Sequence, residues 1–279
     1  MTDLIVAWLN AVSQGATVDM KWALAAPAEY SPVVSAAMAL LHDTVVKPLT
    51  AVILAIIASL SLATTSTRVE GDRELGTRII AATMFKIVMV VLLCQNAPLI
   101  LDAITQVSTW LSKTANGVDV GAGTPTNALG DSMRASIDAA GTMSQLVIIV
   151  MLLVPWLLVA AATAIASVLV VVRFLQLYVM SAFASLPLAF LAHEETKQIG
   201  VGYLKRFAVV ALSGAVLVIV SKLYQALIGG ISGSALTYTG GDVMSFLTSH
   251  FAGFLVGPVV LMFLLFGANN LAKSILGEG

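Results

Sequence analysis

The strongest constraint on the fold is a long apolar stretch, residues 145–172, which holds no charged residue until Arg173 follows it. A helix needs roughly 20 apolar residues to cross the hydrocarbon core of a bilayer, and this stretch exceeds that length. Hydrophobic residues make up 59% of the chain and charged residues 10%, where a soluble domain carries roughly 45–50% and about 25%. The sequence therefore predicts an all-α polytopic membrane protein.

Four further stretches have the length and apolarity of spans. They cover residues 33–65, 79–111, 207–224 and 246–276. Residues 3–13, with Trp8, are apolar but too short to cross, so we expect an interfacial helix there. Five spans are predicted, and segment 174–192 is a re-entrant element or a short sixth span.

The distribution of Lys and Arg predicts the sidedness, because short cytoplasmic loops carry an excess of positive charge. The first loop, 66–78, holds Arg68, Arg73 and Arg78 and should be cytoplasmic, so the N-terminus is expected outside. The long loop 112–143 is poor in charge and should be external, with a short helix over 127–140. The C-terminus is expected in the cytoplasm.

The same rule favours re-entry of segment 174–192. Re-entry places nine of the 14 Lys and Arg residues inside and five outside, whereas six full crossings give six against eight. Pro187 lacks a backbone donor and is the expected break in this segment. A short, kinked sixth span remains the alternative.

Four linear regions follow from these spans. They are an external interfacial segment (1–31), two long helices with a cytoplasmic loop (32–111), an external loop (112–143) and a C-terminal membrane core (144–279). His42, His193 and His250 are far apart in sequence without ligand spacing, and no phosphate-binding loop is recognisable. We expect no catalytic residue, no metal and no cofactor.

Polar and small residues inside the spans are the candidate functional positions. Gln95, Asn96 and Asp102 are candidates for a pore-lining or subunit-facing patch, with interhelical hydrogen bonding as the plainer interpretation. Ala161, Ala162 and Ala166 belong to a small-residue strip that allows close helix packing, either between subunits or within one. A charged cytoplasmic rim is the last candidate set: Arg173, Glu194, Glu195, Lys197, Lys205 and Arg206.

Three consecutive blocks carry a resemblance to a known family. They are an aromatic, small-residue and proline segment (178–189), a polar turn that ends in Gly200 (194–200), and a helix start with Tyr203, Lys205 and Phe207 (203–208). Together they resemble the TrbL-like inner-membrane components of type IV secretion and conjugation machines. The predicted order of spans and loops is similar as well.

The resemblance implies a subunit of the inner-membrane translocation channel or assembly platform, without enzymatic activity, in the cytoplasmic membrane of a bacterium. It implies a homo-oligomeric ring, a pentamer in the family, with phospholipid between subunits. The implied partners are an external stalk or pilus subunit, a cytoplasmic ATPase and the transferred DNA–protein substrate.

A small-solute or ion transporter is the alternative function. Transporters show inverted repeats and paired charges near the membrane midplane. No internal repeat is recognisable, and the charges gather at the ends of the predicted spans.

Overall fold

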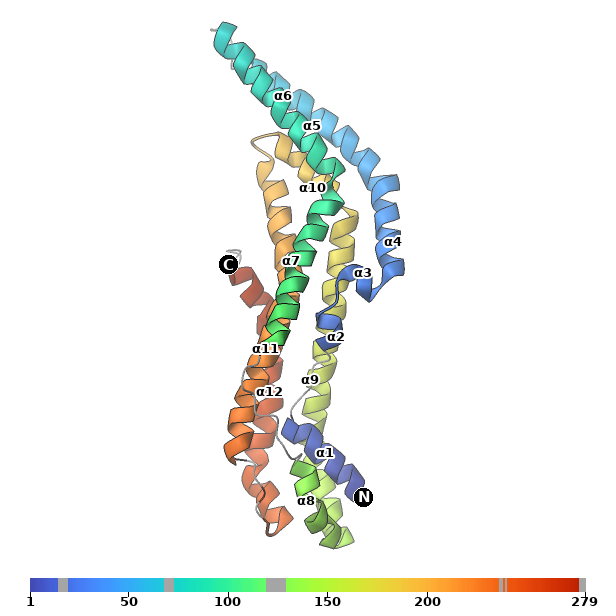
Figure 1. Ribbon diagram of the computed structural model, residues 1–279, viewed down its shortest axis with the longest axis vertical. Coiled ribbons are helices and arrows are strands. Elements are labelled where there is room, and N and C mark those ends of the chain that lie inside the picture. Colours follow the sequence, from blue (N-terminus) through green and yellow to red (C-terminus); the bar gives the residue numbers. More distant parts are fainter. Residues whose placement is uncertain (15–19, 68–72, 119–128, 236–237, 239, 276–279) are drawn as a thin grey trace. The chain divides into compact units, whose positions relative to one another are not determined.

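The computed structural model describes residues 1–14, 20–67, 73–118, 129–235, 238 and 240–275. Arg68 and part of the predicted external loop lie outside these residues. The described chain is helical, without a strand (Figure 1). The helices are α1 (Thr2–Gln14), α2 (Met20–Ala23), α3 (Pro27–Tyr30), α4 (Pro32–Leu41), η1 (His42–Val46), α5 (Lys47–Thr67), α6 (Arg73–Gln95), α7 (Ala97–Gly117), α8 (Leu129–Ala139), α9 (Thr142–Ala182), α10 (Ser185–Ala189), η2 (Phe190–Ala192), α11 (Lys197–Ala235) and α12 (Val243–Ile275).

Five helical stretches among the described residues are long and apolar enough to cross a membrane. They are Pro32–Ser66, Gly76–Gln95, Thr142–Ala182, Lys197–Leu227 and Val243–Ala268. The prediction of five spans is confirmed, and segment 174–192 does not form a span of its own. The second span is shorter than the predicted 79–111, because α6 ends at Gln95 and α7 begins at Ala97. The protein is a multi-pass α-helical membrane protein. At 1.5 Å per residue, α9 is about 60 Å long, roughly twice the thickness of the hydrocarbon core.

Two compact units make up the chain, each built from separate stretches of sequence. The first unit holds Met1–Leu24, Leu111–Val171 and Gly214–Leu271, and the second holds Ala25–Trp110, Val172–Ser213 and Ala272–Gly279. These units cut across the four linear regions predicted from the loops, because α7, α9, α11 and α12 each contribute residues to both.

In the first unit, α1 packs against α8. Ile5 and Leu9 of α1 and Met133 and Ile137 of α8 are fully buried. A short helix was predicted at 127–140, and α8 confirms it. The apolar face of α1 is thus covered by protein, and Trp8 stacks on Trp156 of α9 with ring centroids 4.8 Å apart. The interfacial position expected for this helix stays a prediction.

A hydrogen bond and a close backbone approach fix α1 on α8. The Gly130 N–H donates to Asn10 Oδ1 at 2.7 Å. A Cβ at position 130 would lie 2.4 Å from the Val6 carbonyl oxygen, so only glycine allows this approach. Arg134 of α8 also pairs with Asp3 of α1.

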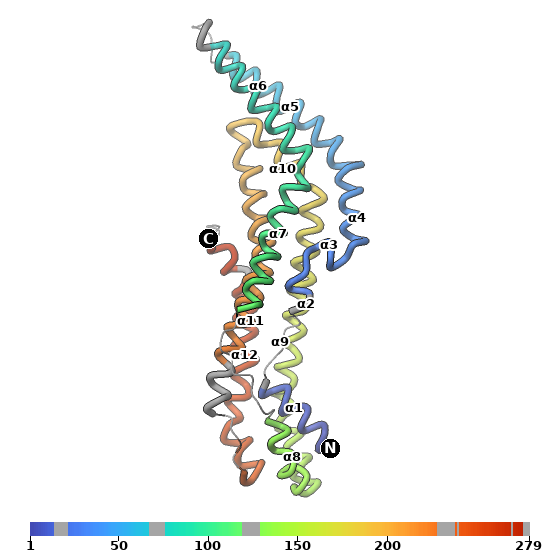
Figure 2. The backbone as a smooth tube through the Cα atoms, in the orientation of Figure 1, coloured from blue at the N-terminus to red at the C-terminus, as the bar shows by residue number. Residues whose placement is uncertain are grey.

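In the second unit, the end of α9 leads into an abrupt change of direction. α9 ends at Ala182, α10 begins at Ser185, and a turn over residues 193–196 precedes α11 (Figure 2). Pro187 is the third residue of α10, a first-turn position where the missing backbone donor has no helical acceptor. Pro187 therefore helps to start a helix, and the prediction that the chain breaks there is wrong. The break lies at Phe183 and Ala184.

Candidate functional site

A polar face lies on α6 and α7, where the two helices meet at Asn96. Gln95, Asn96, Asp102 and Gln106 are all exposed. The Gln106 side chain donates to Asp102 Oδ2 at 2.8 Å, and Asn96 Nδ2 donates to the Leu92 carbonyl oxygen at 2.8 Å. All three residues predicted as a polar patch therefore lie on the surface of the single chain, and Gln106 extends the patch by one helical turn. We call these four residues the α7 polar face.

One contact of α7 in the second unit shows which helix lies beside this face. Ser108 of α7 donates to the carbonyl oxygen of Ala211, which lies in the stretch Lys197–Leu227 that can cross a membrane. Asp102 and Gln106 precede Ser108 by less than two helical turns. The polar side chains are therefore placed alongside a membrane-spanning helix.

Arg173 lies buried in the second unit, whereas the sequence predicted that it belongs to a charged cytoplasmic rim. Its side chain is only 4% exposed, and Nη2 donates to the same Ala211 carbonyl oxygen at 3.1 Å. The guanidinium also lies over the Phe174 ring, 5.3 Å from the centroid. Because these contacts hold the charge inside the protein, α9 does not end there and continues to Ala182. Arg173 is therefore not part of an exposed charged rim, and the end of the third span at this residue stays a prediction.

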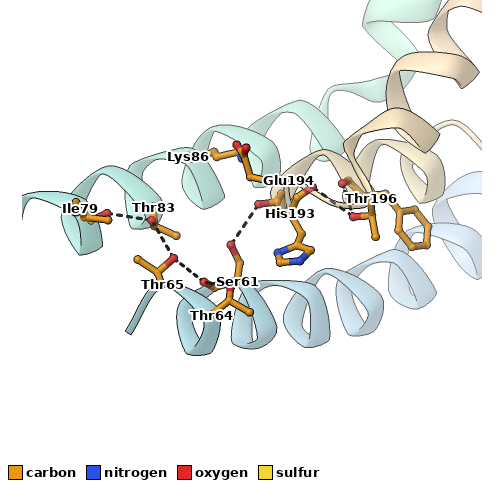
Figure 3. Close-up of polar contacts among 11 residues, drawn as sticks. Ser61, Thr64, Thr65, Ile79, Thr83, Lys86, His193, Glu194 and Thr196 are labelled. Atoms are coloured by element: carbon orange, nitrogen blue, oxygen red, sulfur yellow. Dashed lines mark hydrogen bonds and ion pairs between the residues drawn. The ribbon is translucent and has the colours of Figure 1, made fainter. Parts of the chain in front are cut away.

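The remaining charged residues of the predicted rim are exposed. Glu194, Glu195, Lys197, Lys205 and Arg206 lie in the turn before α11 and in its first turns. Lys86 of α6 pairs with Glu194 at 3.0 Å (Figure 3).

A second contact joins this turn to α5. The Ser61 hydroxyl donates to the Ala192 carbonyl oxygen at 3.4 Å, just before the turn (Figure 3). The two helices that flank the predicted cytoplasmic loop 66–78, α5 and α6, therefore both contact residues at the turn before α11.

The alanine strip of α9 has a different environment. Ala162 is 0% exposed and Ala166 1% exposed in the single chain. Ala161 is half-buried. The strip is thus used for close packing within one chain, and Ala162 and Ala166 are not available to a neighbouring subunit.

One buried polar cluster was missed by the sequence interpretation. His42 Nε2 lies 3.1 Å from Ser185 Oγ, and Thr50 Oγ1 lies 2.9 Å from the same atom. A lone histidine in an apolar helix gives no spacing signal. The residue that completes the cluster is more than a hundred positions further along the chain.

No group of three or more His, Cys, Asp or Glu residues that could hold a metal occurs in the part of the chain that the structure describes. No curated protein and no solved structure matches the chain. Residues 16–185 match the family described as TrbL/VirB6 plasmid conjugal transfer like protein. The sequence blocks that carry the resemblance overlap this match only over residues 178–185. The match therefore rests mainly on the helices that precede those blocks. The matched region is more than half of the sequence, and the chain belongs to the TrbL/VirB6 conjugal transfer family.

Proposed function

We propose that this protein is a non-enzymatic subunit of the inner-membrane translocation channel of a type IV secretion machine, assembled as a homo-oligomeric ring. Family membership supports the secretion machine, and the α7 polar face supports the channel. In a lipid-facing position Asp102 would carry a charge into hydrocarbon, which is costly. A water-filled lumen or a neighbouring subunit removes that cost.

The uneven cover of the five spans supports an assembly. In the fourth span, Lys197–Leu227, 67% of the most apolar part is buried inside the single chain. In the second span, Gly76–Gln95, only 11% of the most apolar part is buried. The fourth span is thus the core of the chain, and the second is left for lipid or other subunits. The α7 polar face continues directly from this second span.

The proposed orientation has the N-terminus outside and the turn 193–196 in the cytoplasm. This orientation gives each ring a cytoplasmic rim with Lys197, Lys205 and Arg206 from every subunit. Such a rim is suited to contact a cytoplasmic ATPase, anionic headgroups or the transferred substrate. The exposed side of α8 is then external and available to a stalk or pilus subunit, and phospholipid fills the gaps between subunits.

The test replaces Asp102 and Gln106 together by Leu. If the face lines the lumen, substrate transfer should fall by about tenfold or more, because apolar side chains remove the hydrated surface. The ring size, measured by native mass spectrometry in detergent, should stay the same. If the face is a subunit contact, the ring should dissociate as well.

Ala103→Leu is the matched control, because Ala103 is exposed beside Asp102 and the substitution leaves the polar pair in place. Normal transfer in the double variant would refute a role for this face. A monomer or dimer of the unaltered protein in detergent would refute the ring and favour the small-solute transporter.

A further inference from the structure

Three side chains, two from the helical stretch Pro32–Ser66 and one from α10, form a closed polar cluster in the second unit. His42 is 2% exposed, Thr50 3% and Ser185 1%. His42 Nε2 and Thr50 Oγ1 both contact the Ser185 hydroxyl, at 3.1 Å and 2.9 Å. Both helical segments that hold these residues, Pro32–Ser66 and Thr142–Ala182 with the following α10, are apolar. A titratable group in such a place marks a functional site more often than a structural one.

The backbone is irregular on both sides of the cluster. His42 begins a π-helical turn, His42–Val46, which interrupts the helix between α4 and α5. Ser185 begins α10 directly after the chain leaves α9. Isolated π turns are frequent at functional sites. The cluster therefore joins two points where the regular α-helix is interrupted.

The hydroxyl protons restrict how the histidine can bond. Thr50 Oγ1 lies 2.8 Å from the Val46 carbonyl oxygen, which can only accept. If Thr50 donates there, Ser185 donates to Thr50, and His42 Nε2 must carry a proton to donate to Ser185. If Ser185 instead donates to His42, then Thr50 donates to Ser185 and the imidazole proton sits on Nδ1. The two arrangements differ in the ring nitrogen of His42 that carries the proton and in the direction in which both hydroxyls donate.

The second ring nitrogen faces the only nearby carboxylate among the contacts of the cluster. His42 Nδ1 has no hydrogen-bond partner and lies 3.6 Å from Asp43 Oδ1, which is also 3.7 Å from Lys47 Nζ. Cys94 of α6 approaches from the other side, with Sγ 3.6 Å from the Ser185 carbonyl oxygen. The short helices α4 and α10 carry no titratable side chain. Asp43, Lys47 and Cys94 are thus the titratable groups around the site.

Serine, histidine and aspartate also form hydrolytic triads, but this cluster lacks the geometry for that chemistry. A nucleophilic serine must face a substrate. Ser185 is almost fully buried, and its hydroxyl is already held by two side chains.

We propose that His42 is a proton-binding site whose protonation releases Ser185 and loosens α10 from α5 and α6. The imidazolium would carry a full charge into the buried site, where only Asp43 offsets it, so the packed arrangement favours neutral His42. Acidification then favours an open arrangement in which the charged ring reaches water. Since α10 leads into the turn at 193–196, the site links proton binding to the start of α11.

Cys94 is a built-in reporter, because it is the only cysteine and it packs on Ser185. The experiment measures the rate at which N-ethylmaleimide modifies Cys94 in the full-length protein in detergent, as a function of pH. His42→Gln is the matched control, because glutamine can bond to Ser185 but cannot titrate. Dividing the two rates removes the ordinary pH dependence of thiol reactivity.

The ratio of the unaltered protein to His42→Gln should rise about fivefold or more from about pH 8 to about pH 5. Ser185→Ala, in which the bond to His42 is absent, should label rapidly and show a pH-independent ratio to His42→Gln. A flat or falling ratio for the unaltered protein would overturn the proposal.

A second measurement keeps the test valid if His42→Gln does not fold. The three histidines of ¹⁵N-histidine-labelled protein can be assigned by removing His193 and His250, which lie outside the cluster. The His42 signal should titrate over the same pH range in which Cys94 of the unaltered protein becomes accessible. A His42 ring that stays neutral throughout would overturn the proposal.

Discussion

Gly200, in the first turn of α11, lies against Leu191 at the end of the preceding segment. A Cβ at position 200 would be 2.6 Å from Leu191 Cγ and 2.9 Å from the Pro187 carbonyl oxygen. Both distances are shorter than real Cβ contacts. The turn at 193–196 can therefore bring α10 and η2 onto α11 only if residue 200 has no side chain.

The first prediction concerns this approach. Gly200→Ala should lower the free energy of unfolding by about 1–3 kcal/mol, because a backbone carbonyl must move to admit the methyl group. Gly202→Ala is the control, since nothing lies within 4 Å of its Cβ position. That change should be neutral or stabilise by roughly 0.5–1 kcal/mol, because alanine favours helix. Unfolding in mixed detergent measures both, and equal effects at the two positions would contradict the packing.

The second prediction concerns α1 and α8. Gly130→Ala should detach α1, because its Cβ would meet the Val6 carbonyl oxygen and Asn10 Oδ1, and Ile5 and Leu9 would lose their cover. Limited proteolysis should then cut within residues 1–14 at least about tenfold faster than in the unaltered protein. Gly141→Ala, with open space around its Cβ position, should keep the slow rate. Equal rates would show that α1 is held by other contacts.

The third prediction concerns the sidedness. In a Cys94→Ala background, single cysteines at Ser66 and Gln198 should be shielded from an impermeant external thiol reagent, and one at Ser132 should react. All three positions are exposed in the structure, so accessibility reports the side of the membrane. Thr196 is less suitable, because its hydroxyl donates to the Phe190 carbonyl oxygen. External labelling at Gln198 together with shielding at Ser66 would contradict the proposal that the first loop and the turn 193–196 lie on the same side of the membrane.

The fourth prediction concerns the proposed cytoplasmic rim. Lys197→Gln combined with Lys205→Gln should lower substrate transfer about tenfold or more if these charges are hot spots of a partner contact, because truncation of a hot spot costs more than about 1 kcal/mol. Expression, topology and ring size should not change, since both side chains are exposed. Normal transfer would mean that the lysines only anchor the chain.

Hydropathy alone predicted the five spans, because a crossing of about 20 apolar residues is a requirement of the bilayer and not of any tertiary contact. The errors lie where tertiary contacts decide. The sequence predicts that Arg173 is a charged residue at the end of the third span, yet contacts with the Ala211 carbonyl oxygen and the Phe174 ring hold its side chain inside the protein. The sequence predicts that Pro187 interrupts the helix, yet this residue lies in the first turn of α10.

The candidate site likewise has one part that local sequence predicts and one part that depends on tertiary contacts. The exposure of Gln95, Asn96 and Asp102 agrees with a patch recognisable from polar residues in an apolar span. The cluster of His42 with Ser185 was not predictable, because no local pattern relates residues 143 positions apart.

The packing of α1 on α8 has a consequence for biosynthesis. The Gly130 amide that Asn10 accepts lies 120 residues further along the chain. While the ribosome makes the intervening segment, the apolar face of α1 has no partner from its own chain. α1, which is made before α8, thus reaches its final place only after α8 has been made. Until α8 arrives, a chaperone or the membrane surface must shelter Ile5 and Leu9.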